Sequence, residues 1–362
     1  MTDHLSALSN DIIHMICAYL TSKERMIFRT INRKFRHVLC GNEISHLYQA
    51  HSSNMVEISF NRINLLQVYF YQIDGPIKFD LPVIVSSLNV YSKESTLDKP
   101  INLVMELPHN LLLRYLYLTV SELTDSLVYA INTYINLSEL VIASQWIVNM
   151  YVRRNIPLIK LITCRLTKLQ LMGFNIVKLP FIETLNSLVL INCVLTDKTV
   201  FESIKVLKVH NCVIDLQHFP NVTDLTMDLV VLSRNKFYEK VTILEIGGGN
   251  YDLTYFPNIS ILKINNNSDQ ANSLISLFNL TNLYLQSVYL NHIPEYPRLK
   301  ELTFNLVAFS NTFEMPFFPC LQSVTFIDSD AVFLNIQNTG VKINNVLTTY
   351  EEDEMEEGSN EE

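Results

Sequence analysis

The sequence lacks a long apolar run and a leader-like start. It has 362 residues, of which 48% are hydrophobic and 17% are charged, a balance typical of a folded chain. No apolar run approaches the roughly 18 residues that a membrane-spanning helix needs. The segment Met1 to Asn10 carries Asp3 before any base and has no apolar stretch, unlike a secretory signal. We therefore expect a soluble protein of the cytoplasm or nucleus, without a membrane partner.

Cysteine and glycine are too sparse for the commonest chemical sites. The six cysteines lie far apart and form no C-x-x-C pair, so neither a zinc site nor a disulfide framework is expected. Three of the eight glycines form the run Gly247–Gly249, which leads into Asn250-Tyr251-Asp252 rather than into a phosphate-binding helix start, and we expect a turn there. No Ser or Cys lies in a nucleophile motif. The sequence thus predicts no catalytic residue, no metal site and no cofactor, and therefore a protein that is not an enzyme.

A basic surface is missing as well. The net charge is −9, and the segment Glu351 to Glu362 contributes eight acidic residues and no base, so subtracting it leaves −1 for the rest of the chain. Nucleic acid, which needs a basic surface, is not expected as a partner. We expect residues 347–362 to form an acidic, disordered tail.

A repeat occupies most of the chain. The frame L-x-x-L-x-L, with other aliphatic residues or Phe allowed, occurs nine times in succession, with first positions at Leu166, Leu185, Ile204, Val222, Val241, Ile259, Leu280, Leu299 and Leu321. The spacings are 19, 19, 18, 19, 18, 21, 19 and 22 residues. Longer copies begin upstream at Ile63, Val85, Leu113 and Leu137. This period and pattern resemble those of leucine-rich repeats.

The frame predicts a solenoid over residues 46–346. Each L-x-L is a three-residue strand whose alternate side chains point inward, and a strand this short buries them only against a stacked neighbour. Cys193 and Cys212 occupy the Asn-or-Cys turn position of the repeat. The short repeats leave room only for extended chain and 3₁₀ turns on the return path. The longer ones can hold helices, which we predict at Leu123 to Tyr134 and Gln145 to Arg154.

The first forty residues follow a helical period instead. Ile12, Ile13, Ile16 and Leu20 share one helix face, and Ile27, Ile31 and Phe35 mark a second helical stretch. The strings Leu8 to Ile16, Tyr19 to Glu24 and Ile31 to Arg36 resemble the F-box. The resemblance implies an adaptor-binding surface made of Leu8, Ser9, Ile12, Ile13, Ile16, Leu20, Ile31 and Phe35.

These features together predict an α/β solenoid: an F-box-like helical module over residues 1–45, then a leucine-rich-repeat horseshoe with a short-strand parallel sheet. The resemblance implies a substrate-recognition subunit of a Skp/cullin/F-box ubiquitin ligase, which binds a Skp-type adaptor subunit and an unknown protein substrate. A leucine-rich-repeat interaction scaffold unrelated to ubiquitination, whose amino-terminal helices only cap the solenoid, is the alternative.

The substrate surface is predicted from strand alternation. The residue between the two apolar positions of each L-x-L points away from the core, on the concave face where repeat proteins bind partners. Tyrosines there offer a large contact area at low entropic cost. The predicted substrate-binding residues are Tyr115, Tyr117, Gln170, Lys208, Glu245, Lys263 and Tyr284.

Overall fold

The computed structural model describes residues 113–120, 125–144, 165–230, 237–329 and 340–346. Outside these ranges it describes seven further strands, which are β1 (Ser45–Ala50), β2 (Met55–Glu57), β3 (Arg62–Tyr71), β4 (Ile77–Asp80), β5 (Ile84–Lys93), β6 (Met105–Glu106) and β9 (Arg154–Asn155). The predicted adaptor-binding residues, from Leu8 to Phe35, and the acidic tail lie outside the described residues. So does the helix predicted from Gln145, except for Arg154, which belongs to β9.

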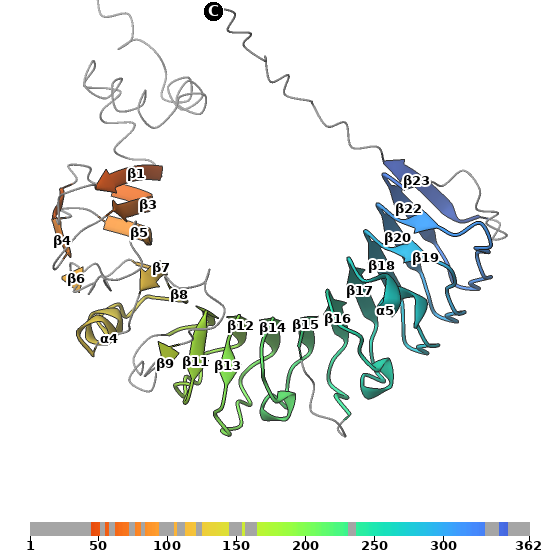
Figure 1. The fold of residues 1–362 in the computed structure, drawn as a ribbon, viewed down its shortest axis with the longest axis horizontal. Helices are drawn as coiled ribbons and strands as arrows, with labels where there is room; N and C mark the ends of the chain where they lie inside the picture. Colours follow the sequence, from red (N-terminus) through yellow and green to blue (C-terminus); the bar gives the residue numbers. More distant parts are fainter. Residues whose placement is uncertain are drawn as a thin grey trace, which may run out of the picture. The chain divides into compact units, whose positions relative to one another are not determined.

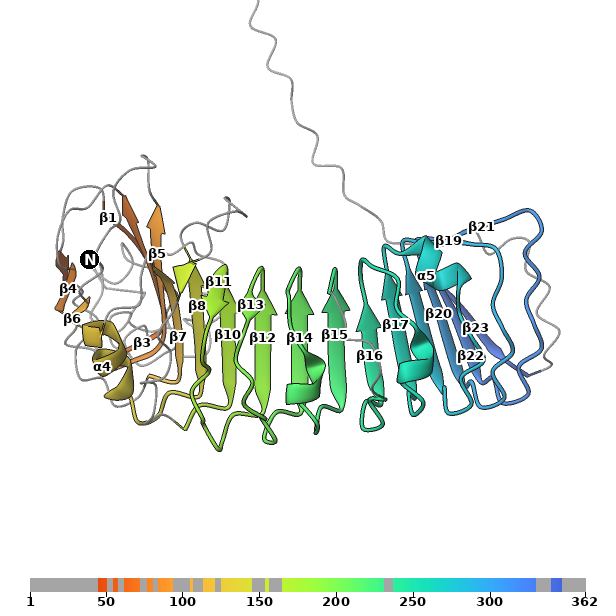
Figure 2. The same cartoon turned by 60° about the horizontal axis from the view of Figure 1, so that its bottom comes forward.

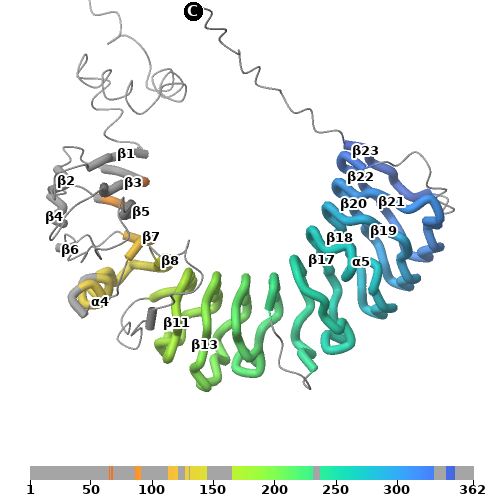
Figure 3. The backbone as a smooth tube through the Cα atoms, in the orientation of Figure 1, coloured from red at the N-terminus to blue at the C-terminus, as the bar shows by residue number. Residues whose placement is uncertain are grey.

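The chain forms two compact units. One comprises Met1–Val222 and Val230–Arg234, and the other comprises Thr223–Leu229 and Asn235–Glu362. In each unit, the backbone advances by one coil per repeat (Figure 3). Each coil contributes one strand to a parallel sheet and returns behind it (Figures 1 and 2). Both units are therefore parallel β-solenoids, as the repeat predicted.

Strand order follows chain order within each unit. In the first unit, neighbouring strands pair in the order β1, β3, β5, β7 (Tyr115–Val120), β8 (Glu139–Ser144), β10 (Lys168–Met172), β12 (Ser187–Ile191) and β14 (Val206–His210). The second pairs β15 (Asp224–Asp228), β16 (Ile243–Ile246), β17 (Ile261–Asn265), β18 (Asn282–Gln286), β20 (Glu301–Asn305), β22 (Ser323–Ile327) and β23 (Lys342–Val346).

The repeat frame sets the register. Leu169, Leu188 and Leu207 are direct neighbours on adjacent strands, and all three are buried. Leu207 and its counterpart in the second unit, Leu244, are both 0% exposed, so the predicted burial is confirmed. The predicted strand length was wrong, because most strands of the regular repeats have five residues rather than three. Neighbours on both sides extend the hydrogen-bond ladder one residue beyond each end of L-x-L.

The return path is short and largely extended. It holds the small sheets β9–β11 (Phe174–Ile176)–β13 (Val194–Leu195), β19 (Tyr289–Leu290)–β21 (Ala308–Phe309) and β2–β4–β6. Two 3₁₀ turns, η3 (Leu216–His218) and η4 (Leu253–Tyr255), begin after Asp215 and Asp252, whose side chains accept a hydrogen bond from the backbone N–H two residues on. The prediction for this path is confirmed.

Two α-helices interrupt the described return path. α4 (Asp125–Asn132) lies within the helix predicted at Leu123 to Tyr134. The short α5 (Ser268–Asn272) was not predicted. It occupies the repeat that begins at Ile259, where the spacing to the next repeat rises to 21 residues. In the parts of the chain that the structure describes, no helix is long and apolar enough to cross a membrane.

A recurrent bend ends the strands. The residue after each of several strands has a positive φ, as at Gly173 (83°), Asn192 (53°), Asn211 (49°) and Asn266 (53°). Gly and Asn adopt this left-handed conformation at low cost. The return path also stacks aromatic rings of successive coils, with centroids 5.5 Å apart for Phe201 and Phe219, 5.2 Å for Tyr238 and Phe256, and 6.3 Å for Tyr296 and Phe318. These rings complete the core opposite the leucines.

Candidate protein-binding face

The side chains that point out of the sheet align from strand to strand. We call this surface the strand face, and its central row consists of the middle residue of each strand. In the first unit the row is Tyr117, Val141, Gln170, Val189 and Lys208. In the second it is Thr226, Glu245, Lys263, Tyr284, Thr303, Thr325 and Asn344.

All seven predicted substrate-binding residues lie on strands of this face, but they form two groups. Tyr115, Tyr117, Gln170 and Lys208 belong to the first unit. Glu245, Lys263 and Tyr284 belong to the second, where they sit directly opposite one another on β16, β17 and β18. The structure therefore brings the second group together as one patch.

The strand face of the first unit is largely apolar at its centre. Val141 and Val189 are only 5% and 7% exposed, and Ala143 is buried. Between them, the Gln170 amide donates to the sulfur of Met172 (Nε2 to Sδ 3.4 Å). These apolar side chains are buried, so the surface that this row offers to a partner comes from Tyr117, Gln170 and Lys208.

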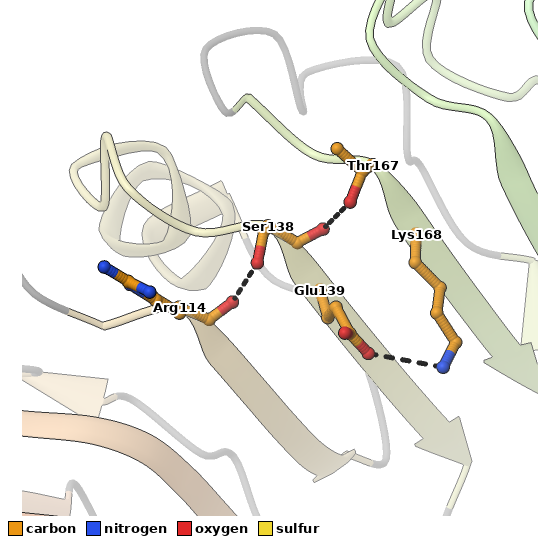
Figure 4. A network of polar contacts seen from close by, with 5 residues as sticks. All are labelled: Arg114, Ser138, Glu139, Thr167 and Lys168. Carbon is orange, nitrogen blue, oxygen red and sulfur yellow. Dashed lines mark hydrogen bonds and ion pairs between the residues drawn. The ribbon is translucent and has the colours of Figure 1, made fainter.

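One edge of this apolar area carries an ion pair. Lys168 and Glu139 face each other on β10 and β8, with Nζ and Oε2 3.2 Å apart (Figure 4). Just before the strands, the Ser138 hydroxyl donates to the Arg114 carbonyl (3.0 Å), and the Thr167 hydroxyl donates to the Ser138 carbonyl (3.1 Å) (Figure 4). These bonds supplement the backbone N–H donors that bind the same carbonyls, and they fix the strand starts.

The strand face of the second unit is polar and connected by side-chain hydrogen bonds. The Tyr284 hydroxyl accepts from Asn305 Nδ2 (2.7 Å) and donates to Gln286 Oε1 (3.3 Å). One strand earlier, Asn265 Nδ2 donates to Glu245 Oε1 (2.8 Å). All five side chains are half-buried. The network holds these groups in fixed positions.

The prediction missed Asn265, Gln286 and Asn305. Each lies two residues beyond the central row on its strand, and so points to the same face. Apart from Tyr115, only the middle residue of each L-x-L was considered, because the strands were taken to be three residues long. The alternation of apolar and polar residues continues past the second apolar position of each frame, and this signal would have found them.

The cysteine pair fills a turn. Cys193 and Cys212 are buried, and the Cys193 backbone N–H donates to the Cys212 sulfur (3.3 Å). The Cys212 thiol in turn donates to the Leu190 and His210 carbonyls (3.3 and 3.1 Å). The hydrogen bond with Cys193, together with burial, raises the pKa of the Cys212 thiol, which favours its neutral form. The interpretation of these cysteines as turn residues is confirmed.

Asn267 occupies the same repeat position in the second unit. Its amide donates to the Gly247 carbonyl (2.8 Å) and the Gly249 carbonyl, and its oxygen accepts from the Gln270 N–H (3.0 Å). The glycine run is thus part of a repeat turn, as predicted, with Gly249 at a φ of 96°. The backbone N–H groups of Gly247 and Gly248 donate to the Met227 carbonyl and to the Asp228 carboxylate.

Comparison with known proteins gives little beyond this geometry. No protein-family model matches the chain, and no curated protein sequence matches it. One solved structure that it resembles is titled "Crystal structure of TLR13-ssRNA13 complex", at 13% identity and a TM-score of 0.41. The match covers 86% of this chain and 56% of that one, so it spans little more than half of that chain's length. A similarity at this TM-score carries no argument about function.

Proposed function

We propose that the protein is the substrate-recognition subunit of a Skp/cullin/F-box ubiquitin ligase. The observation that carries the proposal is the F-box-like sequence from Leu8 to Arg36, followed by a β-solenoid with an aligned, partly exposed strand face. In this role the first forty residues bind a Skp-type adaptor, and the strand face binds a protein substrate. The place of action is the cytoplasm or nucleus.

The proposed subunit performs no chemistry of its own. Holding a substrate near a ubiquitin-loaded enzyme raises the effective concentration of the reacting groups, which by itself accelerates ubiquitin transfer. A solenoid suits this role because each coil within a unit is held by its neighbours, which keeps the side chains of its strand face aligned for a substrate.

An interaction scaffold outside ubiquitination is the second candidate. The strand face favours it, because the aligned, half-buried polar side chains of the second unit suit protein binding whatever the amino-terminal helices do. In this candidate the helices only cover the first coil of the solenoid.

A binding assay with a recombinant Skp-type adaptor separates the two candidates. The full chain is compared with Ile12→Asp and Ile16→Asp, which place a charge on the predicted adaptor-binding face. His14→Asp adds the same charge to the same predicted helix, two residues from Ile12 and away from that face, and is the matched control. We expect the adaptor to bind the wild type and the control but neither Ile variant.

The melting curve of the solenoid provides the second reading. If the first forty residues are a docking module, its circular dichroism persists in Ile12→Asp, because coils are stabilised by nearest neighbours. Wild-type protein that binds no adaptor, combined with an Ile12→Asp variant that melts early, would contradict the ligase proposal and favour the capping role.

A further inference from the structure

Acidic side chains outnumber bases on the first strands of the second unit. Asp224 and Asp228 begin and end β15, and Glu245 on β16 faces Thr226, which lies midway between the two aspartates. All four side chains point to the strand face, because side chains alternate along a strand. The nearest base on this face of the unit is Lys263 on β17. Three acids therefore stand against one base on these three strands.

Two of these carboxylates approach Gly247, one from each side. A Cβ atom added to Gly247 would lie 2.9 Å from the Asp228 carboxyl carbon, so the missing side chain lets Asp228 lie across β16. The Gly248 N–H holds it there by donating to Asp228 Oδ1 (2.5 Å). On the other side, Asn265 lies beside Gly247 on β17, since Ile264 pairs with Ile246, and its Nδ2 donates to Glu245 Oε1 (2.8 Å). Asp228 and Glu245 are thus both held in position.

The same place offers acceptors that the described residues do not fill. Only Oε1 of Glu245 accepts a hydrogen bond from them, and Lys263 forms no ion pair with either oxygen. Asn265 Oδ1 and the Thr226 hydroxyl are buried without a hydrogen-bond partner in the described part of the chain. Thr226 is only 6% exposed, and it lies two residues before Asp228 and opposite Glu245. Buried polar atoms without partners cost free energy, so a ligand that brings several donors is favoured.

We infer that Asp228 and Glu245 bind an arginine side chain of the protein partner, with its guanidinium above Gly247. The excess of acids supplies the charge complementarity. A guanidinium carries five N–H donors in one plane and can meet carboxylates from two sides, whereas an ammonium is a compact point charge. This inference rests on the proposed use of the strand face for substrate binding, and it specifies the substrate chemistry.

The first unit does not offer the same complementarity. From β7 to β14, its strand face carries Lys168 and Lys208 against Glu139. Glu139 is also the carboxylate that already pairs with Lys168. A basic side chain of a partner is therefore directed to the second unit.

The test selects short, unphosphorylated random peptides on the full-length protein, with counter-selection on the double variant Asp228→Asn/Glu245→Gln. The counter-selection removes peptides that bind only the acidic segment Glu351 to Glu362, which the double variant retains. Selected peptides are then titrated against the wild type and each single variant. The new amides keep the oxygens that accept from Gly248 and Asn265 but lose the charge. We expect an enriched Arg, and about tenfold weaker binding to each single variant, as for a lost charged hydrogen bond.

Two further variants fix the sign of the charge effect. Lys263→Gln removes the base opposite Glu245 and should tighten peptide binding about twofold, because it no longer repels the guanidinium. Glu139→Gln is the matched control, since it makes the same change as Glu245→Gln at a glutamate that already pairs with Lys168. It should leave peptide binding unchanged.

Several results would overturn the inference. They are selection of no Arg-containing peptide, equal binding to the wild type and both single variants, weaker binding to Lys263→Gln, or equal binding of a peptide whose Arg is replaced by Lys. Calcium chloride is titrated in place of the peptide, and a calcium ion that the wild type binds and the double variant does not would assign the carboxylates to a metal instead. Adaptor binding by the same preparations reports on the ligase role separately, so the two failures are distinguishable.

Discussion

The two units share a backbone frame, but the side chains of their strand faces differ in chemical character. In the first, the centre of the strand face is made of valines and alanine, and its polar edge carries the Glu139–Lys168 ion pair. In the second, amides and a tyrosine fill the face, and Glu245 bonds to Asn265 rather than to Lys263. The apolar positions of the repeat fix where side chains stand. The residues between those positions fix what the surface can bind.

The turn position shows the same freedom. Cysteines in the first unit and Asn267 in the second both lie next to backbone groups of neighbouring coils. The cysteine fills space and makes weak bonds through sulfur, whereas the asparagine makes three bonds through its amide. The same turn position is therefore expected to contribute different free energies of folding in the two units.

The largest expected effect tests whether the frame is shared. Replacing Leu207 or Leu244 by Ala should lower the free energy of unfolding by about 2–5 kcal/mol in each case, since both leucines are fully buried. Denaturant titration of the full chain measures it, with Lys208→Ala as an exposed control on the same strand as Leu207. A cost near that of the control at either leucine would break the equivalence of the units.

The turn comparison predicts an intermediate effect. Asn267→Ala leaves the buried Gln270 N–H without its acceptor and should cost about 1–3 kcal/mol. Cys193→Ala should cost less, about 1 kcal/mol, because the thiol is a weak donor that mainly fills space. Melting of the two variants side by side measures the order, and a larger loss for Cys193→Ala would contradict this account of the turn.

The smallest effect concerns the two charge pairs. Double-mutant cycles of Glu139→Gln with Lys168→Met should give a coupling of about 0.2–1 kcal/mol, as for an exposed ion pair, and the coupling should fall as salt is added. The same cycle at Glu245 and Lys263 should give a coupling near zero. Equal couplings would mean that Lys263 pairs with Glu245 in spite of the Asn265 hydrogen bond.

Much of this arrangement could be predicted from sequence, for physical reasons. Leu207 and Leu244 recur with a fixed period, and only stacked strands can bury such a series, so the solenoid and its register followed. The strand ends did not follow, because their length depends on ladder bonds to neighbouring coils. Nor did α5, since the repeat of Ile259 exceeds its predecessor by only three residues.

The candidate site was predicted in part. Alternation placed Glu245, Lys263 and Tyr284 on one face. It could not indicate that Asn265 would donate a hydrogen bond to Glu245. That choice depends on side-chain rotamers and on competition between donors a strand apart. The patch was therefore predictable in position and not in its hydrogen bonding.

Hydrogen exchange of the full chain, with and without a recombinant Skp-type adaptor, tests most directly the proposal that the first forty residues bind the adaptor and the strand face does not. Backbone amides buried at a binding surface exchange more slowly, and each segment reports separately. The account predicts slower exchange between Leu8 and Phe35 when the adaptor is present, and unchanged exchange in β15 to β23. Unchanged exchange between Leu8 and Phe35, or protection centred on the strand face, would contradict it.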